Sequence, residues 1–311
     1  MSQPEASPDS ASRQPRWPGF LLAGAGAVAF SGKAIIVKLA YRHGVDAITL
    51  ITYRMLFALP LFVLLAAVAG RGRAALTRRD WVGVLGLGFS GYYLASTLDF
   101  IGLQFISAGL ERLILYLSPT LVLGLGAVLF KRRVRAAQVM ALGVSYCGVL
   151  VVFGHEALLQ AATAGSAANV ALGALFVFAS TLSYAVYLIY SGEEVKRLGA
   201  LRLTGWASIV ACLLCLAQFV VLRPVAALIV APEVLWLSLL NATLCTFAPI
   251  LLVMMAIERI GAVHTTQVGM IGPLSTILMG VLILGEPFTA WVLAGTALVL
   301  LGIWLLAQRM R

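Results

Sequence analysis

Ten long apolar stretches, separated by short polar segments, account for most of the chain. They cover residues 17–41, 47–69, 81–102, 107–130, 136–153, 169–190, 203–222, 234–257, 261–284 and 288–308. A helix of about 20 residues crosses the hydrocarbon core of a bilayer, which is ~30 Å thick. Lipid offers no partners to backbone N–H and C=O groups, so each stretch predicts a helix. The pattern therefore predicts an all-α integral membrane protein with ten transmembrane helices.

The composition supports this prediction and excludes several other classes of protein. Of the 311 residues, 61% are apolar and 11% are charged, whereas an average soluble domain has about 25% charged residues. A soluble protein of this size could not bury so many apolar side chains. The composition also excludes a disordered chain, and four cysteines within apolar stretches do not indicate a disulfide scaffold.

A weak internal repeat relates the two halves at an offset of 154 residues. At this offset Pro119 corresponds to Pro273, and Gly148 corresponds to Gly302. Each half has five apolar stretches, and an odd number of crossings gives the second half the opposite orientation. We therefore expect two inverted five-helix repeats. This is the architecture of many secondary transporters, although a channel or a membrane enzyme can also contain repeats.

The polar segments divide the chain into four parts. They are a cytoplasmic tail (1–16), a first repeat (17–153), a periplasmic loop between the repeats (154–168) and a second repeat (169–308). Neither the tail nor the loop is long enough to form a soluble domain. The tail opens without a basic region, so it does not resemble a cleavable signal peptide.

The distribution of Lys and Arg predicts the orientation. With a cytoplasmic N-terminus and ten crossings, 16 basic residues outside the apolar stretches face the cytoplasm, while only Arg42 and Arg223 face the other side. Cytoplasmic loops of membrane proteins carry such an excess. We expect a multi-pass protein of the inner membrane with both termini in the cytoplasm. The net charge of +10 then needs no nucleic-acid partner.

Two prolines at matching positions indicate a central site. Pro119 lies within the fourth apolar stretch and Pro273 within the ninth. A proline inside a helix removes a backbone hydrogen bond and frees a carbonyl group. Interrupted helices at corresponding places of inverted repeats commonly border a transporter's binding site. The alternative is that each proline only kinks a helix for packing.

Few charged side chains lie inside the apolar stretches. Lys33, near the middle of the first stretch, costs about 2.5–3.5 kcal/mol to insert there. It is too far from the interface to snorkel easily, so it should face either a wet cavity or an acidic partner. Asp99 and Glu111 are the carboxylates inside these stretches, and Glu111 should pair with Arg54, Lys38 or a residue on another helix. The carboxylates could form a structural network, or one could couple protons or bind an amine.

Aromatic and hydroxyl residues suggest the lining of a pathway. Tyr92, Ser96 and Asp99 share one face of a regular helix, and an apolar lining with few polar groups suits a small organic molecule better than a bare ion. Singly, each residue could instead face lipid or pack against a neighbour. The predicted substrate pathway consists of Lys33, Tyr92, Ser96, Asp99, Glu111, Tyr116, Ser118, Pro119, Ser183, Tyr187, Gln267 and Pro273. We expect no catalytic residues, cofactor or bound metal.

The chain also resembles a known family. The segment from Gly102 to Glu111, GLQFISAGLE, leads into Tyr116-Leu-Ser-Pro119, and the second half repeats this rhythm in AIERIGA (256–262), IGP (271–273) and LGEP (284–287). With Lys38 and Arg54, this pattern is similar to the EamA-type exporters of the drug/metabolite transporter superfamily, including their aromatic amino acid branch. The similarity extends over residues 17–308, and one difference is KRR (131–133), where the family's first half often has Gly-Glu.

The resemblance implies a ten-helix carrier that exports metabolites, with amino acids among its substrates. It also implies that the first, third, fourth, sixth, eighth and ninth helices surround a central cavity, with the fifth and tenth at the periphery. We therefore expect a secondary transporter that moves amino acids or related small metabolites out of the cytoplasm by alternating access. A monomer would be sufficient for this transport. The alternatives are a multidrug or other metabolite exporter of the same fold, a channel, or a membrane-embedded enzyme.

Overall fold

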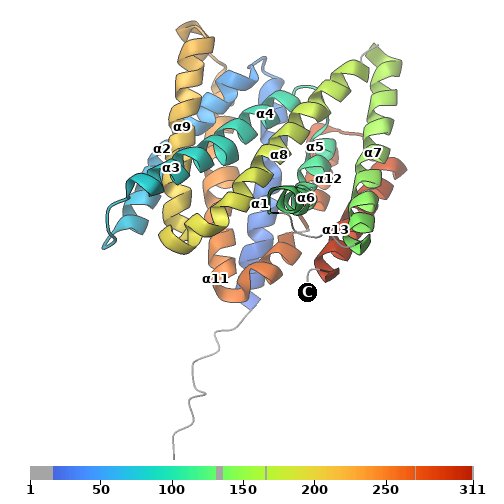
Figure 1. Ribbon diagram of the computed structural model, residues 1–311. Helices are drawn as coiled ribbons and strands as arrows, with labels where there is room; N and C mark the ends of the chain where they lie inside the picture. The colour runs from blue at the N-terminus through green and yellow to red at the C-terminus, as the bar shows by residue number, and fades with distance from the viewer. Residues whose placement is uncertain (1–16, 131–135, 165–166, 270, 310–311) are drawn as a thin grey trace, which may run out of the picture.

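The computed structural model describes residues 17–130, 136–164, 167–269 and 271–309, and all regular structure in these ranges is helical (Figure 1). The helices of the first half are α1 (Trp17–Tyr41), α2 (Ala47–Gly70), α3 (Arg78–Leu87), the π-helix η1 (Gly88–Leu94), α4 (Ala95–Gly102), α5 (Ala108–Leu115), α6 (Ser118–Phe130) and α7 (Ala136–Ala164).

The second half has a similar order with more irregular turns. Its helices are α8 (Ala167–Leu198), α9 (Ala200–Leu222), the 3-10 turn η2 (Val225–Leu228), α10 (Pro232–Ala242), the π-helix η3 (Thr243–Phe247), α11 (Ala248–Gly269), α12 (Ile271–Met279), the π-helix η4 (Gly280–Leu284) and α13 (Ala290–Arg309). The π-helices η1 and η3 occupy equivalent places in the two halves. Thr243, the first residue of η3, lies 243 − 89 = 154 residues after Phe89, the second residue of η1.

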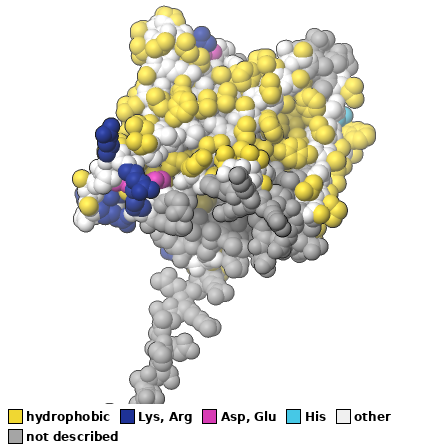
Figure 2. Space-filling model, viewed as in Figure 1, with side chains coloured by type: hydrophobic (Ala, Val, Ile, Leu, Met, Phe, Trp, Pro, Cys, Tyr) yellow, Lys and Arg dark blue, Asp and Glu magenta, His cyan; other side chains and the backbone are white. Residues whose placement is uncertain are grey.

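The predicted all-helical membrane fold is confirmed. In the described ranges, seven helical segments are long and apolar enough to cross a membrane, and three shorter apolar segments, Gly143–His155, Leu274–Leu284 and Ala290–Gly302, match the fifth, ninth and tenth predicted stretches. Large apolar side chains such as Val221 and Leu282 are exposed, and they cover much of the face seen in Figure 2. In a membrane this surface contacts lipid rather than water.

Two connections differ from the prediction. Helix α7 continues to Ala164, so most of the predicted loop 154–168 is helical, because the segment HEALLQAATA is rich in good helix formers. Helix α11 continues to Gly269 without a break after residue 257. In the first half the corresponding break is stabilised by Ser107, which caps α5, whereas position 261, its counterpart, is a glycine with no side chain to act as a cap.

The packing follows the symmetry of two repeats. Helix α1 packs against α11 and α12, while its counterpart α8 packs against α4 and α6. The remaining major pairs, α2 with α9 and α7 with α13, each join equivalent helices. Helices α7 and α13 cross closely, since a Cβ at Gly148 would lie 2.5 Å from the carbonyl oxygen of Gly295. Small residues let membrane helices approach in this way.

The two ends of the bundle carry different charges. Helix α1 begins and α13 ends at the same end (Figure 1). Exposed Lys and Arg side chains gather at this end around the turn between α2 and α3, at the lower left of Figure 2. At the opposite end, named here the Tyr41 end, Arg223 pairs with Asp46 at 3.1 Å. The sidedness of the basic residues in the sequence is therefore present in the fold.

Candidate functional site

Segments of the two repeats meet near the centre of the bundle. Helix α5 ends at Leu115 and α6 starts at Ser118, so the helix is interrupted at Tyr116 and Leu117. Position 270 is the counterpart of Tyr116 in the second repeat, because 270 − 116 = 154, and it lies outside the described residues. The hydroxyl of Tyr116 donates a hydrogen bond to the carbonyl oxygen of Gly269. This bond joins equivalent places of the two repeats.

The backbone at Gly272 of α12 is held by small and polar groups. The Ser31 hydroxyl of α1 donates to the Gly272 carbonyl oxygen at 2.9 Å, and Arg112 Nη2 donates to Ser31 Oγ at 3.0 Å. A Cβ at position 272 would lie 2.5 Å from the Tyr116 hydroxyl. Gly272 is therefore required for this close approach of α12 to α5.

A buried cluster of ion pairs lies beside this contact. Lys33 Nζ of α1 is 2.5 Å from Asp99 Oδ2 of α4 and 3.0 Å from Glu111 Oε1 of α5. The Lys33 and Asp99 side chains are 9% and 4% exposed, and Glu111 is fully buried. Lys33 was expected to face either a wet cavity or an acidic partner, and in the structure it has two acidic partners. Glu111 pairs across helices, with Lys33 rather than with Arg54 or Lys38.

Two arginines extend this cluster at both ends. Arg54 of α2 lies over the ring of Phe100 at 5.0 Å, and Arg112 lies over the rings of Phe30 at 5.4 Å and Tyr116 at 5.6 Å. Both arginines are 6% exposed, so Arg54 does not snorkel. Within the described part of the chain, Arg54 Nε and Nη1 and Arg112 Nε have no hydrogen-bond partner.

The cluster contains an excess of positive charge. Three cationic side chains surround two carboxylates, so in their usual ionised forms the five groups sum to +1. Such groups are costly at membrane depth unless they are paired, and buried charges left unpaired are strongly destabilising. A site of this kind can hold an anionic group or exchange a proton.

The predicted aromatic residues form a second group. The rings of Tyr92 and Tyr187 are 5.2 Å apart and their hydroxyl oxygens 3.2 Å apart, and Tyr184 stacks on Tyr187 at 5.5 Å. Ser183 donates to the carbonyl oxygen of Ser90 at 2.8 Å. This carbonyl belongs to η1, where the π-helical turn changes the helix register. Tyr92, Ser96 and Asp99 were expected on a single face of a regular helix. The chain forms a π-helix at Tyr92, so this expectation does not hold there.

The remaining predicted residues are placed as follows. Ser96 is half-buried in α4, and Ser118 donates to the Leu115 carbonyl oxygen at 2.5 Å. The side chains of Pro119, Pro273 and Gln267 lie outside the described part of the structure. In the backbone, Pro119 falls in the first turn of α6, where a missing N–H costs little, so it starts a helix rather than kinks one. The residue that precedes α12 lies outside the described ones, so the effect of Pro273 on its helix stays a prediction.

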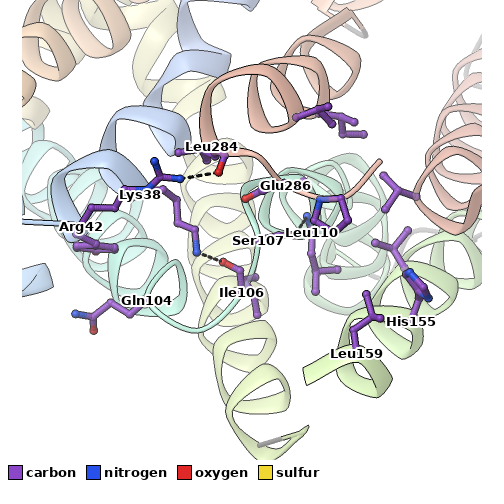
Figure 3. A pocket seen from close by; sticks show the side chains of 17 residues that line it. Lys38, Arg42, Gln104, Ile106, Ser107, Leu110, His155, Leu159, Leu284 and Glu286 are labelled. Carbon is purple, nitrogen blue, oxygen red and sulfur yellow. Dashed lines mark hydrogen bonds between the residues drawn. The ribbon is translucent and has the colours of Figure 1, made fainter. Parts of the chain in front are cut away.

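A cavity of about 740 Å³ opens at the Tyr41 end, and none of the twelve predicted residues lines it. Its walls are mainly apolar, and its polar groups, shown in Figure 3, are Lys38, Tyr41, Arg42, Gln104, Ser107, His155 and Glu286. This volume suits a small organic molecule. The motifs GLQFISA and LGEP contain several of these residues, so the repeated motif was a usable signal for the cavity.

Backbone contacts shape the mouth of this cavity. Lys38 Nζ donates to the Ile106 carbonyl oxygen at 2.8 Å, and Arg42 Nη2 donates to the Leu284 carbonyl oxygen at 2.6 Å (Figure 3). Glu286 Oε1 accepts from the Ala108 backbone N–H at 2.9 Å and so caps α5. Leu110 of α5 lines the cavity, and the next residue, Glu111, contacts Lys33. The cavity therefore adjoins the charged cluster along α5.

Comparison with known proteins identifies the family. The model of the EamA-like transporter family matches residues 17–154 and 171–308. The chain belongs to this family. The two matched segments are displaced by 171 − 17 = 154 residues, the offset found from the sequence repeat. The family consists of transporters, so the alternative of a membrane-embedded enzyme is excluded.

Individual relatives are consistent with this assignment. The uncharacterized transporter YcbK of Bacillus subtilis is 30% identical over 274 residues, covering 84% of this chain and 83% of YcbK. An uncharacterized transporter of Archaeoglobus fulgidus is 24% identical, covering 91% of this chain and 96% of that protein. A solved crystal structure with 19% identity shares the fold at a TM-score of 0.62, over 96% of this chain and 99% of the other.

Proposed function

We propose that this chain is a secondary carrier that exports amino acids, aromatic and other neutral ones included, or related small metabolites by alternating access. The observation that carries the proposal is the hydrogen bond between Tyr116 and Gly269, at equivalent places of the two repeats, beside five buried charges. Helices interrupted at matching points of inverted repeats, as the proline pair predicts, border the central site of many carriers. Ionisable groups at this depth mark substrate or ion pathways.

The orientation follows from the basic residues. We place both termini in the cytoplasm. The end of the bundle at which α1 starts also carries the turn between α2 and α3, which is rich in basic residues: Arg71, Arg73, Arg78 and Arg79. Such basic turns lie on the cytoplasmic side of membrane proteins. The Tyr41 end then faces the periplasm, together with the cavity of about 740 Å³. In this arrangement the cavity is the exit vestibule of an exporter of the inner membrane.

The aromatic side chains support the substrate class. Phe30 and Tyr116 flank Arg112, so apolar and charged surfaces lie side by side. A neutral amino acid has both kinds of surface, with charged groups at one end and an apolar side chain at the other. The recognition of its charged end by buried ionised groups would be strong because these are shielded from water.

The test is counterflow in proteoliposomes. The purified carrier is reconstituted with unlabelled amino acid inside, and uptake of radiolabelled phenylalanine, leucine or threonine is measured against empty liposomes. We expect saturable uptake with competition among substrates, and loss of uptake in Asp99→Asn/Glu111→Gln. Trp236→Leu, which alters a lipid-facing side chain that is 67% exposed, is the control.

Other outcomes are informative. Uptake that rises linearly with concentration and shows no competition would indicate a channel. Saturable uptake of cationic dyes or drugs, with no response to any amino acid, would indicate a multidrug exporter and contradict the proposed substrate class.

A further inference from the structure

We propose that the substrate is recognised through a carboxylate that binds Arg112, beside Gly272 of α12. This inference rests on the proposed function, since it names the chemical group that the carrier selects. Arg112 is 94% buried (6% exposed), and its Nε has no hydrogen-bond partner among the described residues. A buried guanidinium N–H without a partner is costly, and a carboxylate is the acceptor that fits it best.

The charges around Arg112 call for one additional anion. Lys33 already contacts both carboxylates of the cluster, Asp99 and Glu111. The two arginines are then left with the excess of one positive charge. A substrate carboxylate would neutralise it, whereas an uncharged group at the same place would leave it uncompensated.

Arg112 is better placed than Arg54 to receive a substrate. Arg54 lies against Phe100, which is completely buried, so no described opening leads to its guanidinium. Arg112 lies against Phe30, whose ring is 39% exposed and also lies 6.0 Å from Lys33 Nζ. The rotation of one partly exposed aromatic ring would therefore uncover Arg112.

This geometry predicts which part of an amino acid matters. The carboxylate is needed, because it provides the missing negative charge. The ammonium group adds hydrogen bonds rather than the missing charge, because Asp99 Oδ1 and the Glu111 oxygens have no hydrogen-bond partner among the described residues. An amino acid amide should therefore bind poorly, and the acid that lacks the amino group should bind more weakly than the amino acid but more tightly than the amide.

The first experiment measures binding without transport. Thermal unfolding of the purified carrier is recorded with L-phenylalanine, L-leucine and L-threonine, with the amide of each, and with 3-phenylpropanoate and 4-methylpentanoate. We expect at least one acid to raise the unfolding temperature, its amide to bind roughly 10- to 100-fold more weakly, and the effect to disappear in Arg112→Gln. Arg197→Gln, which removes an exposed arginine of α8 at the other end of the bundle, should respond like the wild type.

A second variant allows for misfolding. Arg112→Lys keeps a positive charge beside Glu111 but removes the planar pair of donors, so it should fold and bind with intermediate affinity. Equal stabilisation by acids and amides, stabilisation by no acid, or unchanged acid binding in both Arg112 variants would overturn the inference.

Counterflow of the same compounds separates this inference from the proposed function. Acid-selective binding with no flux of any compound would overturn the carrier function and leave carboxylate recognition intact. Saturable flux of amides as fast as that of acids would overturn carboxylate recognition and leave the carrier function intact.

Discussion

At the residue scale, Lys33 is the centre of the buried ion pairs. Lys33→Met would leave Asp99 and Glu111 buried without the cation that contacts both, which should lower the free energy of unfolding by about 3–5 kcal/mol. Lys33→Met/Asp99→Asn removes one charge of each sign and keeps the net charge of the cluster at +1, so it should recover part of this loss. Thermal unfolding in detergent measures both. A Lys33→Met protein as stable as the wild type would show that the ion pairs contribute nothing to stability.

Asp46, outside the membrane-spanning segments, gives a prediction about pH. Burial tends to raise the pKa of its carboxyl group, but hydrogen bonds from Thr49 and Arg223 outweigh this and hold the pKa below its ordinary value of 3.8. The folded state thus favours the ionised form, and this stabilisation is present at neutral pH and lost as pH falls through and below 3.8. The pair is about one-third exposed, so its contribution is below about 1 kcal/mol.

The measurement is thermal unfolding of wild type and Asp46→Asn between pH 7 and pH 3. We expect the variant to be slightly less stable at neutral pH, and the difference to shrink at the acid end. A difference that stays constant or grows on acidification would contradict the role assigned to the Asp46 carboxylate.

At the element scale, the contact between Tyr116, at the interruption before α6, and α12 should tolerate little added volume. In Gly272→Ala the new methyl group would collide with the Tyr116 hydroxyl, 2.5 Å away, and push α12 away from α5. We expect a folded protein with counterflow slowed at least severalfold. Gly143→Ala in α7, where a Cβ meets nothing within 4 Å, is the matched control. Equal rates in both variants would mean that this contact plays no part in transport.

Sequence patterns predicted the elements better than their irregularities. Apolar length alone located the crossings, because lipid imposes one requirement on every helix. Pro119 correctly pointed to an interrupted helix, and the interruption, at Tyr116 and Leu117, precedes this proline by two residues. The interruption predicted at Pro273 falls outside the described residues and stays a prediction. The π-helices were not predicted, and they redirect Tyr92 towards Tyr187. A register change inside a helix depends on tertiary partners such as Ser183, and no local pattern reveals it.

The candidate site was predicted in part for the same reason. Lys33, Asp99 and Glu111 stood out because charge is rare in apolar stretches, and the structure brings them together. Arg112 is not among the predicted residues, because adjacent residues of a helix point in different directions, and it does point away from Glu111, towards Ser31 on α1. The cavity at the Tyr41 end was not predicted, because its lining comes from four separate stretches of the chain, 38–42, 104–110, 152–159 and 277–292, which only the fold assembles.

At the scale of the whole molecule, the charge asymmetry should fix both termini in the cytoplasm. An alkaline phosphatase reporter fused after Arg311 should be inactive, since this enzyme folds only in the periplasm, whereas a fluorescent protein fused there should be bright. Fusions truncated after residue 160 should show the opposite pattern, because this position lies at the end of α7. The reverse result at Arg311 would invert the proposed orientation and make the cavity of about 740 Å³ face the cytoplasm.

The hydroxyl of Tyr116 links one half of the molecule to the other at the Gly269 carbonyl. A carrier must never be open to both sides at once, or the gradient it works against would dissipate. A bond between the two halves acts as an interlock, because neither half can rearrange while the other keeps its place. Tyr116→Phe removes only this bond, so we expect it to fold, to bind substrate, and to leak. The leak would be measured as net efflux from loaded liposomes without substrate outside, at a rate above that of the wild type.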